Sequence, residues 1–495
     1  MSKQGLLASA KPGATTNTVL YKAPIDASAS TVLSVTAQGG SNTSYDVAVK
    51  DYDQHVVLDA STYKLHTGDV FTGYRFNLGT AVGADQGLNV NQALTSADGE
   101  KSAVFESFYI PPFTSIAVKS KAIRSVAVES VTGTFAVGNT ISKGAGGNTS
   151  VATIFAVASG SGGSTLYIGP STLNGSGTEF TDGDSITASG GATGTISSGG
   201  VGTAANEFTF TTSGGTEDLY LGTTLQILGD RTYRFDVSDS SMSSLVFKLS
   251  ETVNGEWGPD GTAGNTDDGT EYTTGKTTNG TAGSSGAYVQ YDLTANTSLP
   301  ATLYYYEGTT GTAANSNYGG SDRVINTSSS YSYDSVYVYN VSGTWVDNSD
   351  TFTYNGVTYT VTSQTAGPYG FVRDYTGTAL YVVLGEGSAN IAGSDTFLDN
   401  PKLTTGARST VTVSSVTSSG ATVETKHYLR KDNAITANTT EEIKSLVIGP
   451  GQRLVVENND ADCSFTLVGF EDSSTGFTTR AYGQTAGTSG SGGGS

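Results

Sequence analysis

The chain has 495 residues, 65 of them glycine, and charged residues make up only 14%. With 45 acidic against 25 basic residues, its formal net charge is −20, so it lacks the basic surface that nucleic-acid binding requires. No apolar run approaches the roughly 18 residues of a membrane-spanning helix, so we expect no membrane insertion. The first residues lack the apolar core of a signal peptide, which predicts a chain made in a cytoplasm.

The apolar residues, 36% of the chain, fall in short alternating runs rich in Val, Thr, Tyr and Phe. Gly, Asn, Asp and Ser separate these runs, a pattern typical of strands and turns. Almost no stretch has the 3.6-residue period of a helix. The sequence therefore predicts an all-β fold built from several β-sandwich or small-barrel modules.

Two groups of such runs stand at opposite ends of the chain. Residues 18–50 hold three runs, and residues 426–470 hold four more. A sheet of three or four strands buries little apolar surface by itself. We therefore predict that the N- and C-terminal segments pair into one split sandwich, so that everything between them is an insertion.

A second interpretation of the N-terminal runs stays open. Residues 61–125 contain further strand candidates, which would complete the first sandwich locally and make the chain a string of domains. Contacts of Tyr21 or Val47 with the strands around Tyr428 and Leu454 distinguish the two arrangements.

A short pattern recurs along the middle of the chain. It has a small residue and an apolar anchor, then a tight turn of Gly, Asn or Asp, then the apolar start of a strand. The copies are Gly133–Ile141, Gly177–Ile186, Gly343–Phe352 and, more loosely, Gly387–Phe397. Each is too short to bury a core alone, so we expect pairs of copies to pack together.

Between the repeats, residues 228–325 lack the recurring pattern and resemble a known family. The segments that carry the resemblance are Thr232–Phe235, Asp239–Ser241, Gly269–Gly275, Gly280–Gly283 and Leu303–Tyr306. They resemble a cupredoxin-like repeat common in structural proteins of marine tailed phages, which implies a β-sandwich.

That family carries a blue-copper ligand set of His, Cys, His and a weak Met. Here Leu245 stands where the first His would be and Glu307 where the Cys would be, while Thr310 and Ala313 take the spacing of the second His and the Met. We therefore predict a sandwich without a metal and without an electron-transfer function.

Three other motifs predict turns rather than binding sites. Gly275-Lys276-Thr277 lacks the spacing of a P-loop, and no helix follows it. The acidic loop Asp260–Gly269 and the pair Asp182 and Asp184 offer oxygen ligands for Ca²⁺, but they lack the spacing of an EF-hand.

The sequence contains no constellation typical of catalysis. No nucleophile or metal ligand stands at the sequence spacing of a known catalytic or metal motif from His55, His66 or His427. Cys463 lies in an alternating run, which predicts a buried, inert thiol. We predict no catalytic, cofactor-binding or metal-binding residues, and hence no enzyme and no cofactor. The 27 tyrosines, with Trp257 and Trp345, are expected mainly in cross-strand pairs, with a glycan-stacking face as the alternative.

The end segments resemble a second family. The matching segments are Val19–Pro24, Tyr45–Val49, Lys426–Leu429, Ile435–Thr439 and Ile448–Leu454. They are similar to a small virion structural β-sandwich of marine cyanobacterial phages with contractile tails. In that family the Tyr-x-Ala-Pro and Lys-His-Tyr-Leu strands lie in one compact domain, which implies the insertion here. This match covers under a quarter of the chain.

The resemblances imply a non-enzymatic virion structural protein with a docking base and a projecting β-rich body, in the tail, neck or fibre. A capsid-surface decoration and a host-glycan-binding adhesin are the alternatives. The expected partners are other virion proteins and symmetric copies of the chain, with a host-surface glycan under the adhesin alternative. Its expected location is the virion, assembled in the host cytoplasm.

The predicted domains follow from these patterns. They are the split base (1–60 with 420–475), a β extension (61–125), a first repeat module (126–227), a cupredoxin-like sandwich without metal (228–325), a second repeat module (331–403) and a flexible tail (476–495).

Overall fold

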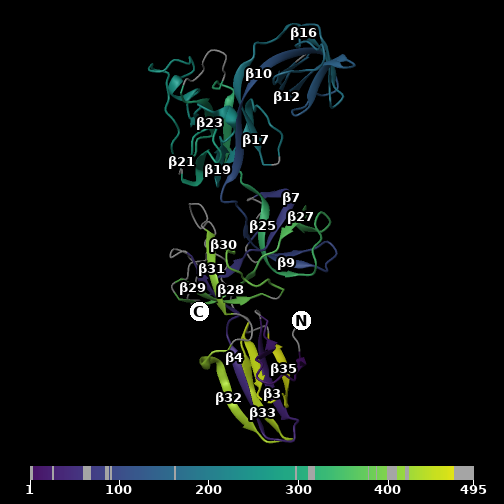
Figure 1. Ribbon diagram of the computed structural model, residues 1–495, viewed down its shortest axis with the longest axis vertical. Helices are drawn as coiled ribbons and strands as arrows, with labels where there is room; N and C mark the ends of the chain where they lie inside the picture. The colour runs from purple at the N-terminus through teal and green to yellow at the C-terminus, as the bar shows by residue number, and fades with distance from the viewer. Residues whose placement is uncertain are drawn as a thin grey trace, which may run out of the picture. The chain divides into compact units, whose positions relative to one another are not determined.

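The fold is all-β, as the alternating runs predict. The computed structural model describes residues 4–472 apart from 25–26, 60–67, 84–87, 90–91, 161–162, 214, 296–297, 310–317, 377, 386, 399–409 and 419–422, so the expected tail lies outside the described residues. The strands divide into two compact units: residues 1–110 with 332–404 and 408–495, and residues 111–331 with 405–407 (Figure 1). The described helices are single 3₁₀ turns, η2 (Ser240–Met242), η3 (Gly255–Trp257), η4 (Leu293–Ala295) and η5 (Thr425–His427).

The two ends of the chain form one β-sandwich, called the base below. Its first sheet has the order β1-β35-β3-β33 and its second the order β2-β34-β4-β32. The strands are β1 (Gln4–Ala10), β35 (Cys463–Asp472), β3 (Ser28–Ala37), β33 (Thr440–Ile448), β2 (Thr18–Lys22), β34 (Arg453–Asn458), β4 (Thr43–Lys50) and β32 (Tyr428–Ile435).

Strands from the two ends alternate across both sheets of the base, so every strand pairs only with strands of the other end. Tyr21 lies opposite Leu454, and Val47 lies opposite Arg430 and Val456. These pairings confirm the split sandwich. The alternative, in which residues 61–125 complete the N-terminal sandwich, is wrong because the C-terminal strands occupy those positions.

Alternation along the base strands explains its core. On β3, every second side chain from Ala29 to Ala37 is buried, and on β35 the same holds for Cys463, Phe465 and Leu467. The Tyr45 ring from the second sheet packs edge-on against Phe465, with ring centroids 6.0 Å apart. The two sheets therefore face each other through one apolar layer.

The rest of the first unit, called the middle module, consists of two six-stranded sheets, β26-β27-β7-β25-β9-β8 and β30-β31-β5-β29-β28-β6. Its strands are β5 (Gln54–Leu58), β6 (Val70–Thr72), β7 (Arg75–Gly83), β8 (Ala93–Thr95), β9 (Ser102–Phe108), β25 (Ser332–Ser342), β26 (Thr351–Tyr354), β27 (Val357–Thr365), β28 (Tyr369–Thr376), β29 (Ala379–Leu384), β30 (Thr396–Leu398) and β31 (Thr410–Ser418).

The middle module corrects three predicted boundaries. β5 belongs to it rather than to the base, and β31 extends it past residue 403. Residues 70–108 are not a separate extension, because β7 and β9 both pair with β25, which lies more than 200 residues later. Their buried side chains, such as Phe76 and Phe105, share one core with Trp345.

The second unit is organised around one long strand, β10 (Thr114–Thr132). Its second half pairs with β13 and β16 of the repeat module, and its first half pairs with β17 and, in parallel, with β19. The repeat module contains β11 (Thr140–Ala145), β12 (Asn148–Gly160), β13 (Gly163–Ile168), β14 (Thr172–Leu173), β15 (Ser185–Ala188) and β16 (Thr193–Val201). The boundary predicted at residue 125 therefore falls inside a continuous strand.

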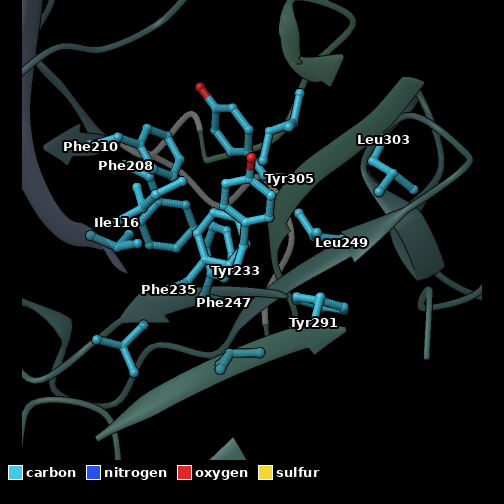
Figure 2. Close-up of a cluster of buried hydrophobic side chains, with 14 of the residues drawn as sticks. Ile116, Phe208, Phe210, Tyr233, Phe235, Phe247, Leu249, Tyr291, Leu303 and Tyr305 are labelled. Carbon is cyan, nitrogen blue, oxygen red and sulfur yellow. The ribbon is translucent and has the colours of Figure 1, made fainter. Parts of the chain in front are cut away.

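The other half of this unit is a sandwich with a large aromatic core (Figure 2). It is built from β17 (Ala205–Thr212), β18 (Gly222–Leu228), β19 (Thr232–Asp236), β20 (Phe247–Ser250), β21 (Lys276–Asn279), β22 (Tyr288–Asp292), β23 (Thr302–Glu307) and β24 (Arg323–Ser328), with the first half of β10. Ile116, Phe208 and Phe210 belong to this core, so the sandwich needs strands from before residue 228, where its predicted boundary lies.

Candidate interaction surface

The turns of the four repeats share one backbone geometry. In each copy, a buried anchor precedes a residue with positive φ, and the strand opposite exchanges two backbone hydrogen bonds with the turn. The anchors are Phe135, Phe180, Trp345 and Ile391, and the positive-φ residues are Gly138, Gly183, Asn348 and Ser394.

Asp184, Asp350 and Asp395 accept hydrogen bonds from backbone N–H groups at the start of their own turns. Asp182 likewise accepts one from the N–H of Gly199, at 2.6 Å. The carboxylates considered as Ca²⁺ ligands thus hold backbone turns, and Asp184 also pairs with Lys143 at 2.5 Å.

The positions that correspond to copper ligands have structural contacts instead. Leu245 packs against the aromatic core, and the fully buried Glu307 accepts hydrogen bonds from the N–H groups of Val246 and Thr309 at 2.8 and 3.0 Å. Thr310 and Ala313 lie outside the described residues. Among the residues that the structure describes, no group of three or more His, Cys, Asp or Glu is placed to hold a metal ion.

The remaining motif candidates also lie in turns. In the acidic loop, Asp260 accepts from the N–H of Thr262, and Asp268 accepts from the N–H of Asn265, both at 2.8 Å. Lys276 begins β21 and forms an ion pair with Glu271. These side chains stabilise the loops in which they lie.

Two of the histidines lie among aromatic side chains, and His66 lies outside the described residues. The ring of His55 stacks on Tyr381 with centroids 4.5 Å apart, and His427 contacts Tyr52 edge-on at 5.7 Å. His427 belongs to η5 rather than to the strand that begins at Tyr428. Within η5, Nδ1 of His427 accepts a hydrogen bond from the backbone N–H of Glu424. The Cys463 thiol is fully buried, and burial raises its pKa.

A buried ionic cluster joins the base to the middle module. Asp53 is 1% exposed, and its carboxylate receives the Lys22 ammonium at 2.7 Å and Nε of Arg453 at 2.5 Å. It also accepts the backbone N–H of Leu384 at 2.7 Å, and Lys22 donates to the carbonyl of the same residue. Because both cations are paired with the buried carboxylate of Asp53, this cluster fixes the junction rather than presenting groups to a ligand.

A polar pocket of about 340 Å³ lies in the repeat module. Its lining residues are Lys143, Gly144, Asn148, Ser150, Ser176, Gly177, Thr178, Asp184 and Ser185. Since Lys143 and Asp184 pair with each other, and Ser150 and Asn148 bond to the pocket's own backbone, the charged and amide groups are already used internally.

The most unusual surface is the outer face of the β1-β35-β3-β33 sheet, called the outer face below. Four of its apolar side chains are strongly exposed: Leu6 (63%), Val447 (60%), Phe470 (54%) and Val468 (40%). Soluble proteins scatter exposed apolar residues singly, and a group of them on one face marks an interaction site.

Strand register places these side chains in two adjacent rows. One row runs Gln4, Phe470, Ser30, Val447 across the four strands, and the next runs Leu6, Val468, Val32 across three. All seven residues are uncharged, on a chain whose net charge is −20. The nearest charges on the outer face are at its margins, at Asp472 and at the Glu442–Lys444 pair.

Sequence reasoning missed this face, although β35 carries a signal for it. On β35, Phe465 and Leu467 are buried, whereas Val468 and Phe470 are exposed. Apolar residues therefore occupy both the inward-facing and the outward-facing positions of this strand. A strand with one solvated face normally has polar residues at its outward-facing positions. The break in alternation therefore marks a strand with two apolar faces.

Comparison of the chain with known proteins identified no relative. Neither the family models, nor the curated proteins, nor the solved structures with which we compared the chain contain a match. Within the described residues, the fold has no helix of the length and apolarity needed to cross a membrane.

Proposed function

We propose that the chain is a non-enzymatic structural protein of a phage virion, in the tail, neck or fibre, and that its base docks through the outer face. The observation that carries the proposal is the apolar, uncharged area formed by Leu6, Val447, Val468 and Phe470 on a strongly acidic chain. Such a surface loses little on leaving water and gains from burial against a matching partner.

The construction of the base supports a docking role. Both ends of the chain meet in this sandwich, and the ionic cluster around Asp53 ties it to the middle module. A load applied to the inserted modules is therefore transmitted to the base through two chain segments and a buried set of charges. This suits a component that must hold its place in a particle.

The carboxylates of the repeats and loops support a structural role rather than a catalytic one. Asp184, Asp350, Asp395 and Glu307 hold backbone N–H groups, which is what a carboxylate does when it stabilises a turn. Trp345, considered for a glycan-stacking face, is 4% exposed and anchors a repeat. That placement favours a virion component over an adhesin.

The test is quantitative mass spectrometry of particles purified from the phage whose genome encodes the chain. We expect the chain at a fixed ratio to the major capsid protein through successive density gradients. Its absence from purified particles contradicts the proposal. Binding of the free chain to host-envelope polysaccharide would favour the adhesin alternative, and release of reducing ends from it would indicate an enzyme.

Particles assembled with variant chains test the docking surface. We expect Val468→Lys/Phe470→Lys to lower incorporation at least tenfold, because lysines at these positions must be desolvated on docking. Leu429→Lys is the matched control, since Leu429 is 43% exposed on β32, in the other sheet of the base. Equal incorporation of the two variants would exclude the outer face as the contact.

A further inference from the structure

We propose that the outer face of the base binds the outer face of a second copy of this chain, forming a twofold-symmetric dimer. This inference rests on the proposed function and deepens it: the partner on which the outer face docks in the particle is a second copy of the chain. The dimer is tested in solution and membership of the virion is tested on purified particles, so a failure of one proposal can be distinguished from a failure of the other.

The shape of the outer face is complementary to itself. β35 presents the bulky, exposed Val468 and Phe470, which form a ridge along the sheet. Its neighbour β3 presents Ser28, Ser30, Val32 and Ser34, which are only half-buried and mostly small, and which therefore form a shallow groove. A short ridge beside a groove at least as long allows the same surface on two copies to fit together, as an isologous contact requires.

A twofold axis parallel to the strands, between β35 and β3, seats each ridge in the other copy's groove. Phe470 then lies over the partner's Ser30, because these two positions share one row of the sheet. Val468 lies over the partner's Val32 for the same reason. At the margins, Leu6 on β1 and Val447 on β33 close the sides of the contact.

Charge and area fit a second copy. Two chains of net charge −20 repel each other, and the uncharged rows of the outer face are where they can approach closely. The whole outer face, four strands spaced about 4.8 Å apart and about 30 Å long, covers roughly 500 Å² per copy or about 1,000 Å² in total, and this area includes the charged margins as well as the two apolar rows. That is the lower end for a specific interface, so we expect a reversible dimer whose population depends on concentration.

The experiment is sedimentation velocity of the full-length chain over a hundredfold range of concentration. We expect a shift from the 50.7 kDa monomer to a species of twice that mass. Because the contact is apolar and the chains are like-charged, raising the salt from about 0.05 to 0.5 M should preserve or strengthen the dimer. A chain that stays monomeric up to about 100 μM, or a dimer that dissociates in salt, overturns the proposal.

Variants assign the contact to the outer face. We expect Val468→Lys/Phe470→Lys to weaken the dimer at least tenfold, although the added lysines reduce the repulsion between copies. Leu429→Lys on the other sheet should leave it unchanged. Ser30→Trp fills the groove without adding charge and should also weaken it, which keeps the test valid if the lysine variant fails to fold.

Two further outcomes would overturn the proposal. A dimer that persists in both outer-face variants has its contact elsewhere. A dimer that dissociates when residues 473–495 are removed depends on the C-terminal segment rather than on the outer face. Near-ultraviolet circular dichroism of each variant reports whether the base remains folded.

Discussion

The hydroxyl of Tyr21 donates a 2.9 Å hydrogen bond to Oε1 of Glu471, a residue 450 positions later in the chain. Tyr21 lies on β2 and Glu471 on β35, so the bond joins the two sheets of the base. Burial of the phenol and the adjacent carboxylate raise the pKa of Tyr21, which keeps it protonated as the donor.

Removing this hydroxyl tests how much the bond contributes. Tyr21→Phe should lower the free energy of unfolding of the base by about 1–2 kcal/mol, because the buried Glu471 loses a donor while the ring stays in place. Chemical denaturation followed by tyrosine fluorescence measures the change. Tyr428→Phe is the control, since its ring contact with Lys431 survives the substitution, and an equal loss in both variants would contradict the expectation.

The cluster at the junction should be far more sensitive than a surface ion pair. Asp53→Asn keeps the shape of the side chain but leaves Lys22 and Arg453 without their shared carboxylate, which should cost about 3 kcal/mol. Lys444→Met, in the exposed pair with Glu442, should change stability by less than about 0.5 kcal/mol. Calorimetric unfolding of the three proteins compares them, and a loss below about 1 kcal/mol in Asp53→Asn would show that the cluster does not stabilise the junction.

His427 should make the stability depend on pH. Burial lowers its pKa below 6.5, although Asp51 and Glu424 oppose the shift. Because the unfolded chain binds this proton more readily, the contribution of neutral His427 is complete above pH 6.5 and is lost as the pH falls from there towards the folded-state pKa. His427→Gln, which can still accept the Glu424 N–H, should show a smaller loss between pH 8 and pH 5. Parallel curves for the two proteins would argue against this origin.

The turn carboxylates should stabilise their repeats. Asp184 accepts the N–H of Thr181 and the Lys143 ammonium. Burial raises its pKa, but these hydrogen bonds outweigh it and lower the pKa overall. Asp184→Asn should therefore destabilise the repeat module by about 1 kcal/mol. Hydrogen exchange of the amides of β15 and β16 would detect the change locally, and unchanged protection there would refute it.

The sequence predicted the class of the fold and the pairing of its ends. Alternation in the runs around Val35 and Leu467 identified strands with one buried face, and the size of each half showed that neither was complete. The recurring anchors, such as Phe180 and Trp345, marked the repeats because a buried aromatic before a tight turn leaves a recognisable spacing.

Domain boundaries could not be obtained from the same patterns. β10 is one continuous strand from Thr114 to Thr132, but its two halves pair with different strands, β17 and β13, and the sequence of β10 does not indicate which strands these are. The outer face was missed for a related reason. Val468 and Phe470 look like core residues in the sequence, and only the register with Leu6 and Ser30 shows that they share an exposed face.

The alternation of strand origin in the base has a consequence for synthesis of the chain. Because no two strands from the same end are neighbours, the N-terminal strands have no partner until β32 to β35 have left the ribosome. The inserted modules, whose strands are complete earlier, can fold first, and the base closes last over very long sequence separations. A chain that stops short of β35 lacks Val468 and Phe470 and cannot present the outer face. Recruitment through this surface would therefore select finished molecules and leave truncated ones behind.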